Sequence, residues 1–262
     1  MDRLLVFADD HSASASTAWE WVCAQYWPGW SAEVVTVIPD GQPGHAPPEP
    51  REWEPAVRRV PYDSTALDHV RHIQASGDAR IVLAGLDADL LVIGARGTGL
   101  AKKLHLGSVA EWLINCPNVP TLIARGGTRV ERVVLAVDGS PQARRAAEEI
   151  AGFPWAAGVH VDVVAVETGD GIASAGAEEA VRLLQSRCAD ARVTVIRPYD
   201  WDLTVNVRGD LLQFLYEHPC DLLVLGTRGL HGWERLRLGS TADYLVHHVE
   251  CSVLLARCAE PG

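Results

Sequence analysis

The sequence has little positive charge, no long apolar run and few cysteines, and each shortage argues against a class of protein. The 262 residues include 23 Lys and Arg against 34 Asp and Glu, a formal net charge of −11. A net negative surface attracts phosphate backbones poorly, so a general nucleic-acid-binding protein is not expected. No apolar run approaches the roughly 18 residues that a membrane-spanning helix needs. We therefore expect neither a nucleic-acid nor a membrane partner.

The six cysteines are scattered along the chain without a C-x-x-C pair, which argues against a disulfide framework and a zinc-ligand pattern. Two histidine pairs, His69 with His72 and His247 with His248, have no Cys or carboxylate at ligand spacing, so no metal site is expected. The first residues, MDRLLVFADDHS, lack the layout of a signal peptide. These features predict a reduced, cytoplasmic protein.

The chain does have the composition of a folded protein and an internal repeat. Apolar residues make up 48% and charged residues 22%, a balance that supports a sizeable core. The segment that begins DLLVIGARGTGL at Asp89 aligns without a gap, at an offset of 132, with the segment that begins DLLVLGTRGLHG at Asp221. Upstream, LLVFADDHS matches VLAVDGSPQ at an offset of 129, and PYD occurs at residues 61–63 and 198–200. We predict two similar domains, residues 1–126 and 130–262, that meet at the linker GGTRVER.

Each half alternates short apolar runs with helical stretches. This alternation indicates a parallel sheet with helices on both faces and right-handed crossovers. Strands are expected at LLVFA and VVLAV, at residues 33–38 and 160–166, at DLLVIG and DLLVLG, and near residues 121–124 and 253–256. Helices are expected at residues 14–26, 79–86, 141–150, 175–188 and 210–218. The proline-rich residues 39–55 favour a long surface loop or a shortened element, and the stretch after each PYD fits either a long third strand or a hairpin.

Glycines recur where the fourth strand of each half ends. They follow the pattern G-x2-G-x9-G-S, formed by Gly94, Gly97, Gly107 and Ser108 and again by Gly226, Gly229, Gly239 and Ser240. Open α/β sheets bind ligands beyond the carboxyl ends of their strands, and glycine lets a ligand approach the backbone. A serine that caps the next helix leaves the first amides of that helix facing the loop, where they can bind an anion. The pattern therefore predicts a phosphate-binding loop in each half.

A second interpretation of these loops stays open. The glycines can serve the turn alone and the serines can be ordinary caps, because the pattern is neither a Walker A motif nor a dinucleotide-binding fingerprint. The neighbouring cations can neutralise phosphate charge or stay solvated. These cations are Arg96, Lys102, Lys103, Arg228, Arg235 and Arg237. The repetition of the spacing in both halves favours ligand binding.

Four tryptophans, Trp19, Trp21, Trp27 and Trp30, crowd the region of the first helix. Aromatic residues of this kind can mark a surface for a partner. They pack more often in a core or over a seam between helix and sheet, and we expect that here.

The glycine pattern after an Asp-Leu-Leu-Val strand, with an earlier strand that ends in Asp, resembles the universal stress protein family, here in a tandem form. The resemblance covers nearly the whole chain. It implies a doubly wound α/β fold with a five-stranded parallel sheet in the order 3-2-1-4-5 in each half. It implies pairing of the two domains within one chain, with a homodimer as a further option. It also implies an adenine nucleotide ligand, because members that carry this motif typically bind ATP, here expected with Mg²⁺.

The resemblance also implies site residues in both halves. In the first half it implies Asp9 at the nucleoside, Val37 at adenine, and Gly94, Gly97, Gly107, Ser108 and Val109 at ribose and phosphates. In the second half it implies Asp138, Val166, Gly226, Gly229, Gly239, Ser240 and Thr241 in the same roles. The second half reads Asp-Gly-Ser at residues 138–140, whereas the first reads Asp-Asp-His-Ser at residues 9–12. The extra carboxylate repels phosphate unless Mg²⁺ bridges the two, so the first site is the weaker candidate.

We therefore expect an ATP-binding stress-response protein that uses the nucleotide as a conformational or partner switch. No catalytic residue is identified, because no arrangement of Ser, His and Asp defines a nucleophile and base and nothing supplies a base to activate water. Fast turnover is not expected, and any ATPase activity should be weak. The alternatives are a nucleotide-free interaction module on the same fold and a weak ATP-hydrolysing enzyme.

Overall fold

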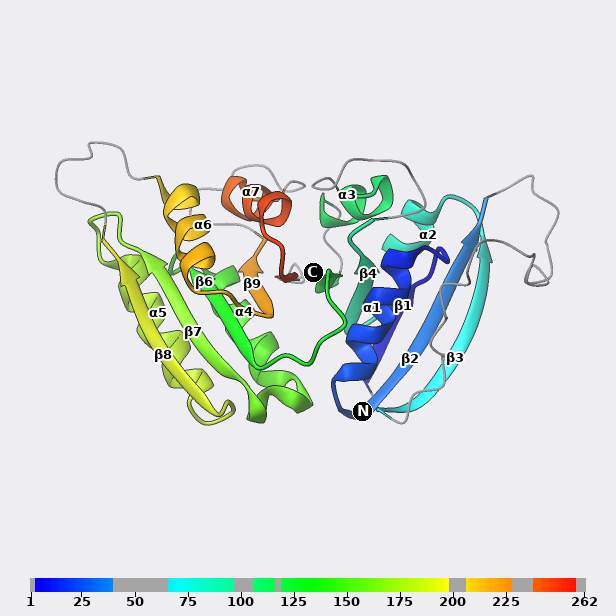
Figure 1. The fold of residues 1–262 in the computed structure, drawn as a ribbon, viewed down its shortest axis with the longest axis horizontal. Coiled ribbons are helices and arrows are strands. Elements are labelled where there is room, and N and C mark those ends of the chain that lie inside the picture. The colour runs from blue at the N-terminus through cyan, green and yellow to red at the C-terminus, as the bar shows by residue number, and fades with distance from the viewer. Residues whose placement is uncertain are drawn as a thin grey trace.

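A single β-sheet of ten strands runs through both halves of the chain (Figure 1). The computed structural model describes residues 3–39, 66–96, 106–115, 119–197, 206–227 and 238–257. The predicted α/β class is confirmed, because strands and helices alternate along each half.

The first half contributes five strands and three helices. They are β1 (Arg3–Ala8), α1 (Ala13–Ala24), β2 (Trp27–Ile38), β3 (Leu67–Ser76), α2 (Ala79–Ala84), β4 (Leu90–Gly94), α3 (Ser108–Asn115) and β5 (Thr121–Ala124). The second half contributes five strands, four α-helices and a 3₁₀ turn. They are β6 (Arg132–Val137), α4 (Pro141–Gly152), η1 (Pro154–Gly158), β7 (His160–Val166), α5 (Ile172–Leu184), β8 (Asp190–Ile196), α6 (Val207–Glu217), β9 (Leu222–Gly226), α7 (Ser240–His248) and β10 (Ser252–Ala256).

The strand order is β3-β2-β1-β4-β5-β10-β9-β6-β7-β8. Each half therefore has the predicted order 3-2-1-4-5, with parallel pairing between its own neighbours. The two five-stranded sheets join edge to edge, because β5 pairs antiparallel with β10. Joining the edges gives both strands backbone partners, and an exposed strand edge is a site of unwanted pairing.

Helices cover both faces of this sheet, as the alternation of apolar strand residues requires. Leu5 and Phe7 of β1 belong to a buried cluster with residues of α1, α4 and α5. Val6, between them, points to the opposite face and belongs to a second cluster with residues of α2, α3, α6 and α7. The molecule is thus a three-layer α/β/α arrangement in which the carboxyl ends of the parallel strands stay available for loops.

Two details of the sequence analysis are corrected by the structure. Strand β2 begins at Trp27, six residues earlier than expected, with a register irregularity against β3 between Trp27 and Ser31. The two PYD motifs are not equivalent, because residues 61–63 precede β3 whereas residues 198–200 follow β8. A three-residue match is short enough to arise by chance.

The stretch that follows the first motif forms the long third strand rather than a hairpin. The proline-rich residues 40–55 lie outside the described part of the chain.

The tryptophans pack in the core, as predicted, and also join the two halves. Trp27 is fully buried, and its ring centroid lies 5.8 Å from that of Phe153 and 6.0 Å from that of Trp155 in the second half. Trp30 contacts Phe153 at 6.0 Å, and Trp21 contacts Trp155 at 6.1 Å. Burying large aromatic side chains makes them dominant contributors to core and interface stability.

Two arginines strengthen the joint between the halves. Arg125, which follows β5, donates to the carbonyl oxygens of Val246 at 2.5 Å and Cys251 at 3.2 Å in the second half. Arg257, which follows β10, donates to the carbonyl oxygen of Leu113 in the first half at 2.7 Å. Each half therefore places the arginine after its last strand against the end of the other half's last helix, where unpaired carbonyls and the negative end of the helix dipole favour a cation.

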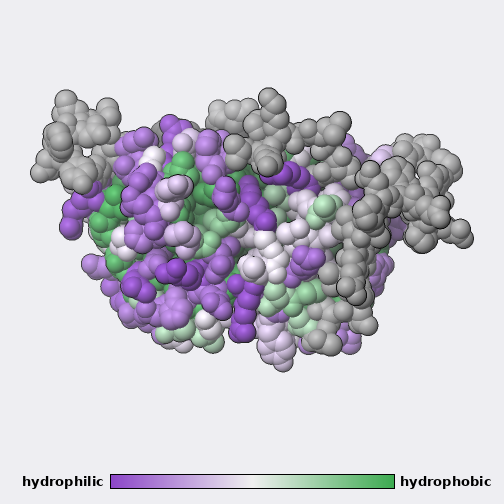
Figure 2. Space-filling model, in the orientation of Figure 1, coloured by the Kyte–Doolittle hydropathy of each residue, from purple (hydrophilic) through white to green (hydrophobic). Residues whose placement is uncertain are grey.

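The outer surface fits this layered core. Figure 2 shows the second half with a mostly hydrophilic surface on which apolar side chains emerge in separate patches. Isolated apolar residues of this kind are ordinary on protein surfaces.

Candidate functional site

The candidate site lies where the strand order of each half reverses. Strand β1 has β2 on one side and β4 on the other, and β6 has β7 and β9. In an open α/β sheet the connections leave such a strand in opposite directions and open a crevice beyond its carboxyl end. Asp9 and Asp138 come directly after these central strands, and Gly94 and Gly226 end the neighbouring ones. The topology therefore brings the predicted residues of each half to one sheet edge.

In the second half the loop after β6 is short and uses one glycine. Asp138 is half-buried, and its Oδ1 accepts a hydrogen bond from the Ser140 amide at 3.0 Å. Gly139 has a φ of +79°, a conformation that favours glycine. Ser140 caps α4, since its side chain accepts from the Ala143 amide. The loop thus fixes the Asp138 carboxylate at the carboxyl edge of β6.

In the first half the same turn has one more residue and a histidine in place of the glycine. His11 has a φ of 62°, and its amide donates to Asp9 Oδ1 at 2.8 Å. The His11 ring Nδ1 lies 2.8 Å from Asp9 Oδ2, and Asp9 is only 4% exposed. Ser12 caps α1 as Ser140 caps α4. The first-half carboxylate is therefore engaged by its own loop.

Gly94 and Gly226 are required by packing. A Cβ added to Gly94 would lie 2.7 Å from the Ser14 carbonyl carbon, and a Cβ on Gly226 would lie 2.9 Å from that of Gln142. Both contacts are with the backbone of the helix that follows the central strand, which cannot move aside cheaply. These two glycines therefore let α1 and α4 approach the sheet, whatever the loops bind.

The third glycine of each pattern closes the loop and starts a helix. The Gly107 amide donates to the Ala95 carbonyl at 3.0 Å, and the Gly239 amide donates to the Thr227 carbonyl at 2.8 Å. Most residues between these anchors lie outside the described part of the chain, including Gly97, Gly229 and all the loop cations except Arg96. Both loops therefore leave and re-enter the sheet edge at equivalent points.

The structure corrects the predicted role of the serines. Helix α7 begins at Ser240 and has Gly239 as its N-cap, and α3 begins at Ser108 after Gly107, whose carbonyl accepts from Glu111. The serines are first helical residues, not caps. The first amides of a helix have no acceptor within it and carry its positive dipole end, so they suit an anion. Ser108 and Ser240 are exposed, and Val109 and Thr241 beside them are half-buried.

The two predicted valines lie in the sheet beside these loops. Val37 is opposite Ala75 near the end of β2, two residues beyond Val35, whose carbonyl accepts from the Asp9 amide. Val166 ends β7 opposite Ile196 and is 4% exposed. The backbone of each valine lies next to a central strand, where it could contact the adenine ring of a nucleotide. The side chains of both valines pack in the core.

Comparison with known proteins identifies the family. A profile of the universal stress protein family matches residues 1–125 and again residues 129–257. The chain belongs to the universal stress protein family. It is 41% identical over 59 residues to a universal stress protein of Synechocystis sp., a match that covers 22% of this chain and only 38% of that relative.

Two further relatives cover more of their own length. A universal stress protein of Methanocaldococcus jannaschii is 26% identical over 149 residues, which is 52% of this chain and 88% of that protein. The crystal structure of a universal stress protein from Archaeoglobus fulgidus has a TM-score of 0.65 at 17% identity and covers 98% of this chain and 99% of its own. At this identity the likeness shows the shared fold alone. Within the described residues, none of the helices is both long enough and apolar enough to span a membrane.

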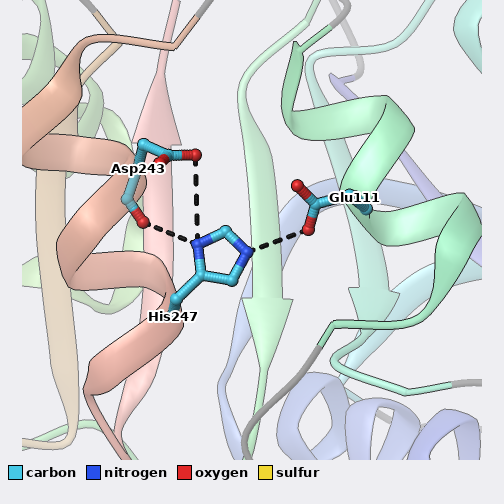
Figure 3. A group of neighbouring side chains, drawn as sticks. All are labelled: Glu111, Asp243 and His247. Atoms are coloured by element: carbon cyan, nitrogen blue, oxygen red, sulfur yellow. Dashed lines mark hydrogen bonds and ion pairs between the residues drawn. The ribbon is translucent and has the colours of Figure 1, made fainter. Parts of the chain in front are cut away.

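This universal stress protein carries a second polar cluster, which the sequence analysis missed. Figure 3 shows Glu111 on α3 facing Asp243 and His247 on α7. His247 Nε2 lies 2.9 Å from Glu111 Oε2, and His247 Nδ1 lies 2.7 Å from the Asp243 carbonyl oxygen. Glu111 and Asp243 are equivalent positions at the offset of 132, and a histidine four residues after Asp243 shares its helix face. The two equivalent carboxylates and the spacing of four between Asp243 and His247 could have indicated this cluster from the sequence.

The cluster links the halves through a histidine placed between two carboxylates. Burial acts to lower the pKa of His247, but the hydrogen bonds to the Asp243 carbonyl and to Glu111, with both carboxylate charges, raise it overall. The three ligand atoms lie within 4.8 Å of one another, so these side chains could hold a metal ion in place of the proton. The contact between His247 on α7 and Glu111 on α3 becomes an ion pair when the imidazole is protonated.

Proposed function

We propose that this universal stress protein binds ATP with Mg²⁺ in its second half and uses the nucleotide as a conformational or partner switch. The observation that carries the proposal is the hydrogen bond from the Gly239 amide to the Thr227 carbonyl, which holds the start of α7 at the carboxyl edge of the sheet. A loop that ends on helix amides with a glycine N-cap suits a phosphate group. The proposal treats residues 1–126 and 130–262 as two domains that pair within one cytoplasmic chain, with a homodimer as a further option.

The residues present fit such a ligand by their chemistry. Amides of Ser240 and Thr241 would hold phosphate oxygens, Asp138 would accept hydrogen bonds from the nucleoside, and the backbone at Val166 would meet adenine. Gly229 and Gly226 belong to the same loop, the latter at the end of β9. Bound Mg²⁺ would supply charge neutralisation between phosphate oxygens.

Nucleotide retention fits this site better than rapid hydrolysis. The carboxylate in the turn after β6 is that of Asp138, and its Oδ1 already accepts a hydrogen bond from the Ser140 amide. Hydrolysis needs a group that orients or deprotonates water in line with the phosphate. A nucleotide that is held rather than consumed acts by binding one state of the protein better than another.

The first half is a weaker site in this proposal. Asp9 would have to exchange its contact with His11 for a nucleoside, and Asp10 adds negative charge beside it. If a nucleotide does bind here, its phosphates would lie against the first-half motif, as proposed for the second half. That motif consists of Gly94, Gly97, Gly107, Ser108 and Val109. We therefore expect one tight nucleotide site per chain.

Calorimetric titration with ATP and Mg²⁺ tests the proposal, with a matched pair of variants. Gly239→Val places a branched side chain at the N-cap of α7 and should weaken ATP binding by at least about tenfold. Gly107→Val makes the same change at α3 and should leave the tight site intact. Equal, undiminished binding in the Gly239→Val variant, or no binding heat with the unchanged protein at millimolar ATP, would refute the proposal.

One observation favours a second candidate function, a nucleotide-free interaction module. Packing against α1 and α4 alone accounts for Gly94 and Gly226, without any ligand. The two candidates are separated by the absorbance spectrum of the purified protein and by extraction of retained nucleotide. Retained adenine supports ATP binding, whereas a bare protein that also gives no binding heat supports the module.

A further inference from the structure

Two cysteines meet at the sheet edge opposite the glycine loops. Cys220 precedes β9 and Cys251 precedes β10, and these neighbouring strands are parallel. The Cys220 thiol donates to the Cys251 sulfur, with a separation of 3.7 Å between the two Sγ atoms. Both residues are half-buried rather than sealed within the core. A disulfide needs the sulfurs at about 2.05 Å, so the two side chains must rotate toward each other to form one.

The pair belongs to the second half alone. At the offset of 132 the equivalent positions in the first half are Ala88 and Val119. The fold therefore accepts alanine and valine at these points and does not require a thiol for packing. Because the first half folds without this cysteine pair, the pair in the second half can have a chemical role that is separate from the fold.

The surroundings make the two thiols unequal. The hydrogen bond from Cys220 and the positive charge of Arg125 lower the pKa of Cys251, although burial acts against this. The Arg125 guanidinium comes from the first half and donates to the Cys251 carbonyl oxygen at 3.2 Å. The hydrogen bond that the Cys220 thiol donates to Cys251 raises the pKa of Cys220, and burial raises it further. Since the thiolate is the reactive form, Cys251 is the sulfur that reacts first.

We propose that Cys220 and Cys251 are an oxidation site at which a hydroperoxide forms a reversible disulfide between β9 and β10. The Cys251 thiolate attacks one peroxide oxygen, the O–O bond breaks, and the second oxygen leaves as an alcohol or water after taking a proton. Cys251 is then a sulfenic acid. Cys220 attacks its sulfur, the S–S bond forms, the S–O bond breaks, and the hydroxide leaves as water with the Cys220 proton. Two thiols lose two electrons, and one peroxide gains them.

The disulfide would act on the joint between the halves. Cys251 lies next to Ser252, whose hydroxyl accepts from the Arg125 amide, and to the start of the only strand that pairs with the first half among the described residues. Oxidation removes the ionisable thiol of Cys251 beside Arg125 and ties β9 to β10 at this edge. The candidate nucleotide loops leave the opposite edge, so the oxidation site does not depend on the proposed function.

Peptide mapping by mass spectrometry after hydrogen peroxide treatment of the full chain tests the inference. The expected product is a peptide pair joined through Cys220 and Cys251, two hydrogens lighter than the reduced pair and restored by dithiothreitol. Cys188→Ser, at a half-buried thiol whose pKa burial raises to about 11, is the control and should leave this product unchanged. Cys220 and Cys251 remaining reduced while other cysteines oxidise would overturn the inference.

A sulfenic-acid trap tests the order of the two thiols. In Cys220→Ser the Cys251 sulfenic acid cannot be resolved, so labelling by dimedone at Cys251 should exceed labelling at Cys220 in Cys251→Ser by about tenfold. Circular dichroism confirms that both variants fold, and Cys220→Ala or Cys251→Val, which introduces the residue of the first half at that position, replaces the serine variant that does not. Comparable labelling of the two single variants would contradict the proposed roles.

Discussion

At the carboxyl edge of the sheet the two halves differ in the loop that follows their central strand. Both loops place one residue at positive φ just before the serine that caps the next helix. The second half uses Gly139, which has no side chain, and leaves Asp138 half-buried at the edge. The first half uses His11, whose ring lies against Asp9. The same backbone requirement has therefore been met in two ways, and only one of them leaves the carboxylate accessible to a ligand.

Several residues that hold the fold are shared by the two halves. Asp89 accepts from the Leu4 amide at 2.8 Å, and Asp221 accepts from the Arg132 amide at 2.9 Å, so each ties the start of its first strand to the fourth. Gly94 and Gly226 likewise admit a helix to the sheet. The halves also differ in side chains that can carry chemistry. The comparison teaches that a motif residue shared by both halves can serve the fold alone.

The largest effect should come from adding a methyl group to the second-half loop. A Cβ on Gly139 would lie 2.6 Å from the Ile172 carbonyl oxygen at a φ of +79°. Gly139→Ala should lower the free energy of unfolding by about 3 kcal/mol, from backbone strain and a clash with backbone together. Urea unfolding followed by circular dichroism measures this loss.

Gly171→Ala is the matched control for that variant. Gly171 has a similar φ of +73°, but its added Cβ would meet nothing within 4 Å. The control should therefore cost only about 1 kcal/mol, from the backbone conformation alone. Equal losses in the two variants would show that the contact with Ile172 is not what reserves this position for glycine.

The next effect concerns nucleotide affinity and depends on the proposed function. Asp138→Asn should weaken ATP binding by about tenfold, or about 1.4 kcal/mol, because it removes a charged hydrogen-bond acceptor at the nucleoside. Asp9→Asn should change the affinity of the tight site by less than about twofold, because that carboxylate already serves His11. Calorimetric titration of both variants measures the difference, and equal weakening would mean that the halves are not functionally distinct.

Much of the fold could be predicted from the sequence, because buried parallel strands give apolar runs and duplication gave each run twice. β7 matches its predicted bounds, and the order 3-2-1-4-5 followed from the resemblance. The early start of β2 could not be predicted, because Trp-Pro-Gly-Trp at residues 27–30 has the composition of a turn and is held in the strand by tertiary packing. Local propensity was overridden by the aromatic contact between the halves.

The candidate site was predictable only in its backbone pattern. The glycine spacing located both loops, but the contact of His11 with Asp9 depends on a side-chain direction set by a positive φ. The Glu111–His247 and Cys220–Cys251 pairs join residues that are 136 and 31 positions apart. Such pairs are fixed by strand order and by the joining of the two sheets, which local patterns do not encode.

The smallest effect should come from the contact between α3 and α7, where Asn115 and His247 occupy equivalent positions. Asn115 donates to the Glu111 carbonyl just as His247 pairs with the Asp243 carbonyl, so His247→Asn gives α7 the residue that α3 has at this position. The pKa of His247 is raised above its ordinary value of 6.5, as the carbonyl of Asp243 and the carboxylate of Glu111 favour the imidazolium over the opposing effect of burial. A group whose pKa is raised by folding stabilises the folded state fully at pH values below its pKa in the unfolded chain. That stabilisation disappears as the pH rises through its pKa in the folded protein.

The unchanged protein should therefore exceed the His247→Asn variant in unfolding free energy by up to about 1 kcal/mol near pH 6, and by much less near pH 9. His248→Asn is the control, because His248 stacks on Tyr244 and its ring nitrogen contacts the Tyr244 carbonyl rather than a carboxylate across the joint. Denaturant unfolding at the two pH values measures both variants. A difference that stays constant with pH would assign the His247 contribution to packing. A difference that grows with pH would mean that the neutral ring, not the imidazolium, is the form that links the halves.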